Sequence, residues 1–216
     1  MAENLFETDY DVTKKSKLKE FYESNKILIF SVILIFIISL GAFNYYLETI
    51  KKKKILLSEN YLQAKIYLET GYKNEAINLL RELIFANDRT YSTLSFFLML
   101  NRDLIGNYEE ISSLFDHLLI NNKYKEEEKN LLIYKKILFN SNFANETKLL
   151  EDSKLLLNTN TLWKPHVLLL LGDYFVSKNE NLKATEFYTQ IFSINNLHKD
   201  LYDQAKLKLE SISNDK

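Results

Sequence analysis

The side chains that most often carry catalysis or bind metals are sparse in this sequence and do not combine into a site. The three histidines are His117, His166 and His198, and none has a partner at metal-ligand spacing with a convincing third ligand. Cysteine is absent, so neither a disulfide nor a thiolate metal site can form. No P-loop, nucleophile elbow or dinucleotide-binding motif occurs. The sequence therefore predicts no catalytic residue, no metal site and no cofactor.

The overall composition excludes further classes of protein. The 28 Lys and Arg residues are balanced by 29 Asp and Glu residues, which leaves no basic excess for binding nucleic acid. Only four glycines and one proline occur in 216 residues. Because a β-rich fold needs turn residues repeatedly, this composition predicts an all-α fold with short polar loops.

Short sequence blocks recur in the region from residue 48 to residue 216. The three clear copies begin at Gly71, Gly106 and Asn179, and a degenerate copy lies at Ser141 to Glu146. The spacing is close to the roughly 34 residues of a tetratricopeptide repeat, which is a helix–turn–helix unit. We therefore predict a tetratricopeptide-like α-solenoid over residues 48–216, with an unspecialised α-helical bundle as the alternative.

Small and large apolar residues alternate within the expected helix pairs. Ala64, Ala76, Gly172 and Ala184 occupy the small positions, which would let paired helices approach closely. The last stretch, Leu197 to Ile212, is amphipathic and is expected to be a C-terminal capping helix, because a solenoid must cover its last apolar face.

The repeat pattern also indicates where a partner protein would bind. In tetratricopeptide arrays the first helices of successive repeats line a concave groove. Aligned to that pattern, the expected groove-facing residues are Ser58, Tyr61, Lys65, Phe96, Asp103, His166 and Asp173. Aromatic and charged side chains together suit the recognition of a peptide or a partner protein. The alternative is that some of these side chains are buried against neighbouring helices.

One apolar stretch, residues 27–47, dominates the N-terminal part of the chain. It contains no charged residue, and a helix of this length spans about 30 Å, the thickness of the bilayer hydrocarbon. We predict a transmembrane helix, which is retained because the polar start is too long and no small-residue cleavage site follows. The alternative is a buried helix of a soluble domain.

The flanks of this stretch carry lysines on both sides. Residues 1–26 begin acidic and become basic, and Leu18, Phe21 and Tyr22 form a small apolar face that is typical of a short helix at the membrane surface; a disordered tail is the alternative. Five lysines flank the stretch within twenty residues on each side, so the charge rule does not orient it. Because neither Gly nor Pro occurs from residue 42 to residue 70, we expect one unbroken helix from about Asn25 to about Glu69.

Three stretches together suggest a family. They are Thr8–Val12 with Lys17–Tyr22 before the apolar run, Trp163 leading to Leu171 and Gly172, and the closing Gln204–Leu209. With them, the chain resembles the YfgM-like membrane-anchored proteins, which are ancillary subunits of the bacterial SecYEG translocon, in their alphaproteobacterial form.

The resemblance implies a single-pass protein of the bacterial inner membrane, with a cytoplasmic N-terminus and a periplasmic repeat domain. It implies a non-catalytic scaffold whose partners are the SecYEG translocon, periplasmic chaperones and secreted chains. Two other functions stay open at the level of sequence: a repeat adaptor for cell-envelope assembly or division, and an accessory subunit of an enzyme. The sequence names neither the individual partner nor the oligomeric state.

Overall fold

The computed structural model describes residues 17–214, and within that range every regular element is an α-helix. The helices are α1 (Lys17–Thr70), α2 (Lys73–Phe85), α3 (Tyr91–Asn101), α4 (Tyr108–Asn121), α5 (Glu126–Phe143), α6 (Glu146–Leu157), α7 (Lys164–Ser177), α8 (Asn181–Ile191) and α9 (Lys199–Asn214). The prediction of an all-α fold is confirmed. The acidic start of the tail and the stretch Thr8–Val12 lie outside the described residues.

The chain divides into two compact units, Met1–Leu56 and Leu57–Lys216. In the first unit, the apolar residues of α1 are exposed around the whole helix, as Phe36 and Ile37 illustrate. The helix is long and apolar enough to cross a membrane. As predicted, the helix continues without a break through Lys51–Lys54. Within α1, the one residue with a non-helical backbone conformation is Asn25.

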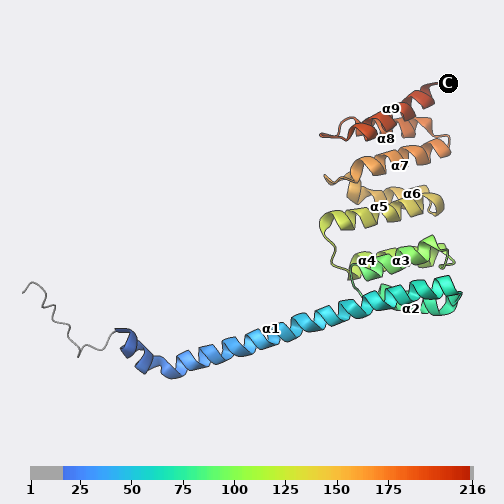
Figure 1. The fold of residues 1–216 in the computed structure, drawn as a ribbon. Helices are drawn as coiled ribbons and strands as arrows, with labels where there is room; N and C mark the ends of the chain where they lie inside the picture. The colour runs from blue at the N-terminus through green and yellow to red at the C-terminus, as the bar shows by residue number, and fades with distance from the viewer. Residues whose placement is uncertain (1–16, 215–216) are drawn as a thin grey trace, which may run out of the picture. The chain divides into compact units, whose positions relative to one another are not determined.

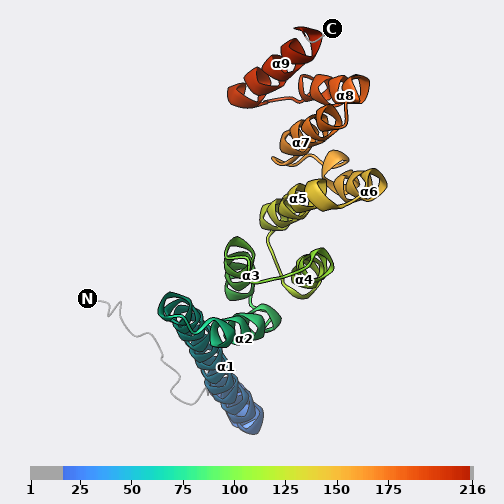
Figure 2. The ribbon, with the colours of Figure 1, turned by 90° about the vertical axis from the view of Figure 1, so that its right-hand side faces the viewer.

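The second unit consists of helix pairs that follow one another along the chain (Figure 1). Seen along the helices, α3, α5 and α7 lie on one side and α4, α6 and α8 on the other (Figure 2). We call the side with α3, α5 and α7 the first-helix face. Gly71, with φ +87°, begins the turn between α1 and α2, where only glycine adopts this backbone conformation without strain.

The pair α7 and α8 is packed most closely, because Gly172 allows it. A Cβ atom at position 172 would clash with the ring of Tyr188 on α8, which is fully buried. The Tyr188 hydroxyl donates a hydrogen bond of 2.5 Å to Asp173 Oδ1, and Lys208 Nζ of α9 lies 2.7 Å from the same oxygen. The carboxylate of Asp173 therefore ties three successive helices together.

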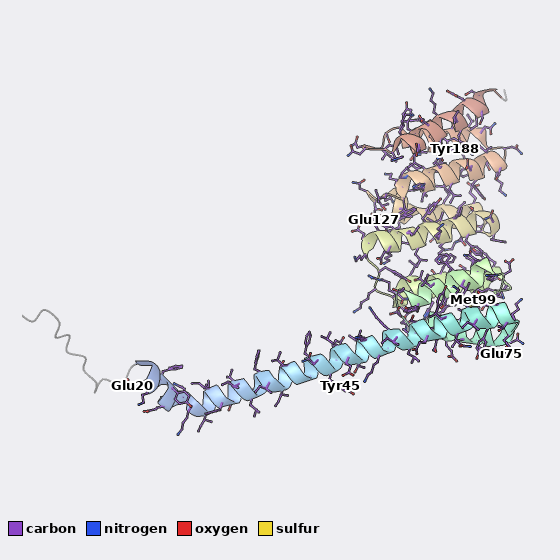
Figure 3. All side chains as sticks on the ribbon, in the orientation of Figure 1. Glu20, Tyr45, Glu75, Met99, Glu127 and Tyr188 are labelled. Carbon is purple, nitrogen blue, oxygen red and sulfur yellow. The ribbon has the colours of Figure 1, made fainter. Side chains whose placement is uncertain are left out.

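Two hydrophobic cores fill the second unit, and Figure 3 labels one residue of each. The first core contains Met99 and lies within α1 to α4, with Leu132 added from α5. The second core contains Tyr188 and extends from α5 to α9. Leu119 packs against both cores, so they meet where α4 joins α5.

An ion pair between a buried lysine and an exposed aspartate links α5 to α4. Lys136 Nζ lies 2.7 Å from Asp116 Oδ1, and the Lys136 side chain is only 10% exposed. A polar chain also attaches the loop before α7 to α5, since Asn130 Nδ2 donates to Thr161 Oγ1 at 3.2 Å and Thr161 Oγ1 donates to Glu127 at 3.2 Å. Together with the ion pair, whose Asp116 side chain is 52% exposed, these contacts link α5 to its neighbours.

Candidate partner-binding surface

A pocket of about 420 Å³ opens between α3 and α5. Its volume lies within the range of about 300–1,000 Å³ that is common for ligand pockets. We call it the α3–α5 pocket, and its lining residues are Arg89, Thr90, Thr93, Leu94, Phe97, Tyr124, Glu128, Leu131, Leu132 and Lys135. It belongs to the first-helix face, since both of its helices lie on that side (Figure 2).

Two matching helical stripes build the walls of this pocket. On α3 and its N-cap residue the lining residues run from Thr90 to Phe97, and on α5 they run from Glu128 to Lys135. In both helices the four positions are i, i+3, i+4 and i+7, which fall on one side of an α-helix. Each helix therefore presents one side to the pocket and keeps another for its core.

The pocket lining contains both apolar and polar side chains. Leu94 is 43% exposed and lies with Phe97 and Leu131 among its apolar lining. Among the polar side chains, Thr93 Oγ1 and Tyr124 Oη are 2.7 Å apart and share a hydrogen bond. Burial is the largest influence on the Tyr124 phenol and raises its pKa, so this hydroxyl stays protonated as a hydrogen-bonding group at neutral pH.

Charged side chains also line the pocket. Arg89 Nε lies 3.4 Å from Glu128 Oε2, and both side chains are partly exposed. An ion pair this exposed contributes little to stability, at most about 1 kcal/mol. Arg89 or Glu128 can therefore leave this ion pair at little cost and pair with a charged group of another molecule. Lys135 adds a further cation to the lining.

The residues expected from the sequence to face a groove occupy different environments. Tyr61 is half-buried and packs against Tyr91, with ring centroids 6.2 Å apart, and burial raises its pKa. Lys65 is exposed and Ser58 is half-buried. These positions on α1 are compatible with a surface role.

Two of the expected residues lie elsewhere. Phe96 is fully buried in the first core, where its ring meets Phe115 edge-on at 4.6 Å, so it does not face a groove. Its neighbour Phe97 lines the pocket instead. Asp103 is exposed but follows the end of α3, in a turn with φ +49°, and not on the helical side that the alignment gave it.

His166 belongs to an aromatic cluster on the same face. Its ring centroid lies 5.4 Å from that of Trp163 and 5.8 Å from that of Tyr134, and these two rings stack at 5.3 Å. Burial lowers the pKa of His166, so the imidazole is neutral at neutral pH. Burial raises the pKa of the Tyr134 phenol, and the negative charge of Asp173 raises it further by a smaller amount. Asp173 also contacts Tyr188 and Lys208.

The α3–α5 pocket is not evident from the sequence. The signal that marks it is the pair of i, i+3, i+4, i+7 stripes. In α3 this signal is obscured, because the sequence from Leu94 to Leu100 is apolar on almost every side. Only the neighbouring helices determine which of those sides is buried.

Within residues 17–214, no group of three or more potential metal ligands comes together. His117, for example, is held by two asparagines: its Nε2 lies 3.0 Å from Asn87 Oδ1 and its Nδ1 lies 3.1 Å from Asn121 Nδ2. Its ring also meets Phe85 edge-on at 4.7 Å. These contacts give it a structural role between the α2–α3 turn and α4.

Comparisons of the chain with protein-family models, with curated proteins and with solved structures found no match.

Proposed function

We propose that this protein is a membrane-anchored, non-catalytic scaffold whose helical unit binds other proteins through the first-helix face. The observation that carries this proposal is the α3–α5 pocket, whose lining combines apolar side chains with a hydrogen-bonded pair and charged groups. Protein interfaces commonly have this anatomy, with an apolar anchor side chain in a central pocket and polar groups around it.

The helical unit is proposed to be a tetratricopeptide-like solenoid. In support, the small residues Ala76, Gly172 and Ala184 are all buried where helices pair. The terminal helix α9 is proposed to act as the cap. It packs against α8 through the buried Ala205, and its exposed positions include Lys206 and several other charged residues.

The cellular setting of the scaffold rests on the resemblance to the YfgM-like proteins. We place the protein in a bacterial inner membrane, with its N-terminus in the cytoplasm and its helical unit in the periplasm. There it would hold periplasmic chaperones or secreted chains near the SecYEG translocon. Tethering to the membrane raises local concentration, so such a role does not need high intrinsic affinity.

A photocrosslinking amino acid at Leu94 tests the pocket directly. Leu155 is the matched control, because it is also an exposed leucine, at 53% against 43%. It belongs to α6, and that helix lies on the opposite side of the helix pairs (Figure 2). We expect translocon components or periplasmic chaperones to crosslink from position 94 and not from position 155. Recovery of envelope-assembly components instead would favour the repeat-adaptor function.

Substitution of the same two leucines separates binding from crosslinking chemistry. Leu94→Asp should reduce co-purification of the captured partner at least several-fold, because it places a charge in the apolar part of the lining. Leu155→Asp should leave it unchanged. Equal losses from the two variants would show that the pocket is not the binding site, and failure to capture any protein would contradict the scaffold function.

The proposed orientation has its own test, which the absence of native cysteine makes simple. Ser24→Cys and Ser213→Cys place one thiol on each side of the apolar run, at exposed positions. In cells with a permeabilised outer membrane, a membrane-impermeant thiol reagent should label position 213, and position 24 only after the inner membrane is broken. The reverse pattern would invert the orientation, and equal labelling of both would contradict a single span.

A further inference from the structure

A short amphipathic segment precedes the apolar run within the first unit. Its two aromatic rings, Phe21 and Tyr22, are 62% and 47% exposed. At about 100° per residue, Glu20 and Glu23 lie roughly opposite the direction midway between these rings. The segment therefore has an aromatic side and an acidic side, whereas the run that follows it is apolar all round.

The helix is broken at Asn25, just before the apolar run begins. Asn25 has a non-helical backbone, with φ −117° and ψ 15°, and Figure 1 shows the bend near the start of α1. The Asn25 side-chain Nδ2 donates a hydrogen bond of 3.0 Å to the carbonyl oxygen of Phe21. In a regular α-helix that oxygen accepts from the backbone N–H of residue 25.

This hydrogen bond gives the break a local cause. Asparagine side chains compete with the helical ladder for backbone partners, and a side chain that enters the ladder is a common origin of helix kinks. The change of direction thus coincides with the change from a two-sided segment to an all-apolar one. Figure 3 places Glu20 on the bent segment, before the long straight part of α1.

We propose that the segment before Asn25 lies in the lipid interface, with Phe21 and Tyr22 inserted beside the headgroups and Glu20 and Glu23 facing water. A straight continuation of the span would instead carry residue 21 about 9 Å beyond Ile27, into water. Interfacial helices bury their apolar side about 5–10 Å into the boundary between headgroups and acyl chains. Lipid is the occupant because the segment is continuous with the apolar run, whose first residue, Ile27, is 77% exposed.

This inference rests on the proposed membrane span, and it gives the anchor a second point of attachment. A single helix can rotate about its axis and slide along the bilayer normal. A short segment held in one leaflet restricts both motions, because lifting it would expose two aromatic rings to water.

Site-directed spin labelling of the full-length protein tests the proposal. Single cysteines at positions 20 to 23 carry a nitroxide in vesicles of phosphatidylcholine and phosphatidylglycerol. Collision rates with oxygen report lipid, and those with a water-soluble nickel chelate report water. Labels at 21 and 22 should have a several-fold higher ratio of oxygen to nickel collisions than labels at 20 and 23.

Two results would overturn the proposal. Nickel-accessible labels at all four positions would mean that the segment stands in water, and oxygen-rich labels at all four would mean that the span extends through it. Labels at positions 33 to 36 test the membrane span separately from the interfacial segment. They should be oxygen-rich on every side of the helix, and nickel access there would contradict the membrane span.

The role of Asn25 is tested in the same labelled proteins. Asn25→Leu removes the side-chain donor, so the ladder can close and the contrast between positions 20 and 21 should shrink. Ser24→Ala, one residue earlier, is the matched control and should keep the contrast. An unchanged contrast in Asn25→Leu would show that Asn25 does not cause the break.

Discussion

The two cores of the helical unit are packed by different means. In the first core, aromatic rings meet edge-on, and the centroids of Phe96 and Phe115 are 4.6 Å apart. In the second core, a glycine brings α7 against α8, so the Tyr188 ring lies over the Gly172 backbone. The first arrangement fills space with large side chains, whereas the second removes the space by bringing the helices together.

This difference accounts for the position of the pocket. Leu132 on α5 belongs to the first core and lines the pocket, while the next residue, Ile133, belongs to the second core. At this junction α3 presents Leu94 and Phe97, with no small residue that would let α5 approach it closely. The α3–α5 pocket therefore lies where one mode of packing gives way to the other, and substitutions in each core test the two modes.

The largest effects are expected from charge placed where helices pair. Ala76→Arg in the first half and Ala184→Arg in the second should each destabilise the protein by about 3 kcal/mol or more, because the guanidinium is buried unpaired or separates the helices. Both alanines are fully buried. Thermal melts of the detergent-solubilised protein, followed by circular dichroism, measure the loss. The exposed neighbours provide controls, Glu75→Arg and Glu186→Arg, and melts as high as theirs would contradict close pairing at these sites.

A single methyl group should distinguish the two halves. Gly172→Ala directs a Cβ into the Tyr188 ring and should cost about 1–3 kcal/mol, as overpacking does. Gly106→Ala in the first half has no atom within 4 Å of the new Cβ and should be neutral or slightly stabilising. The same melts compare the two variants, and equal midpoints would mean that the glycine does not control the α7–α8 distance.

Trp163→Phe should have a smaller effect than the loss of ring area suggests. The Trp163 Nε1–H is buried without a hydrogen-bond partner among the described residues, and such a group costs about 1–3 kcal/mol. Its removal offsets part of the lost stacking on Tyr134, so the net change should stay within about 1 kcal/mol. A much larger loss of stability would indicate that the indole nitrogen is paired in the native protein.

The smallest effect should appear as pH falls. Burial lowers the pKa of His166 below its ordinary 6.5, so the unfolded chain binds a proton at a higher pH than the folded protein does. The neutral imidazole thus favours folding above pH 6.5, and this contribution is lost as the pH falls from there through the folded pKa. Between pH 6.5 and the folded pKa, the melting midpoint of His166→Phe should fall less than that of the unmutated protein. Equal decreases in His166→Phe and in the unmutated protein would place His166 in solvent.

The elements of this protein could be predicted from the sequence because they depend on local pattern. An uncharged run from residue 27 to residue 47 is long enough to span a bilayer wherever the rest of the chain lies. The turn at Gly71 could likewise be predicted, because glycine adopts a positive φ without strain. The scarcity of proline and glycine elsewhere predicted helices joined by short loops. The buried positions Ala76 and Ala184 were also expected, since their spacing repeats along the chain.

The α3–α5 pocket was decided by the tertiary structure alone. Phe96 and Phe97 are adjacent and chemically identical, yet one is fully buried in the core and the other lines the pocket. The surrounding sequence does not indicate which side of α3 is buried, because that helix is apolar almost all round. The packing of α2 and α4 against α3 selects the side that enters the core, and the other side is left to face α5. That choice depends on contacts between residues far apart in the chain, for which local periodicity carries no information.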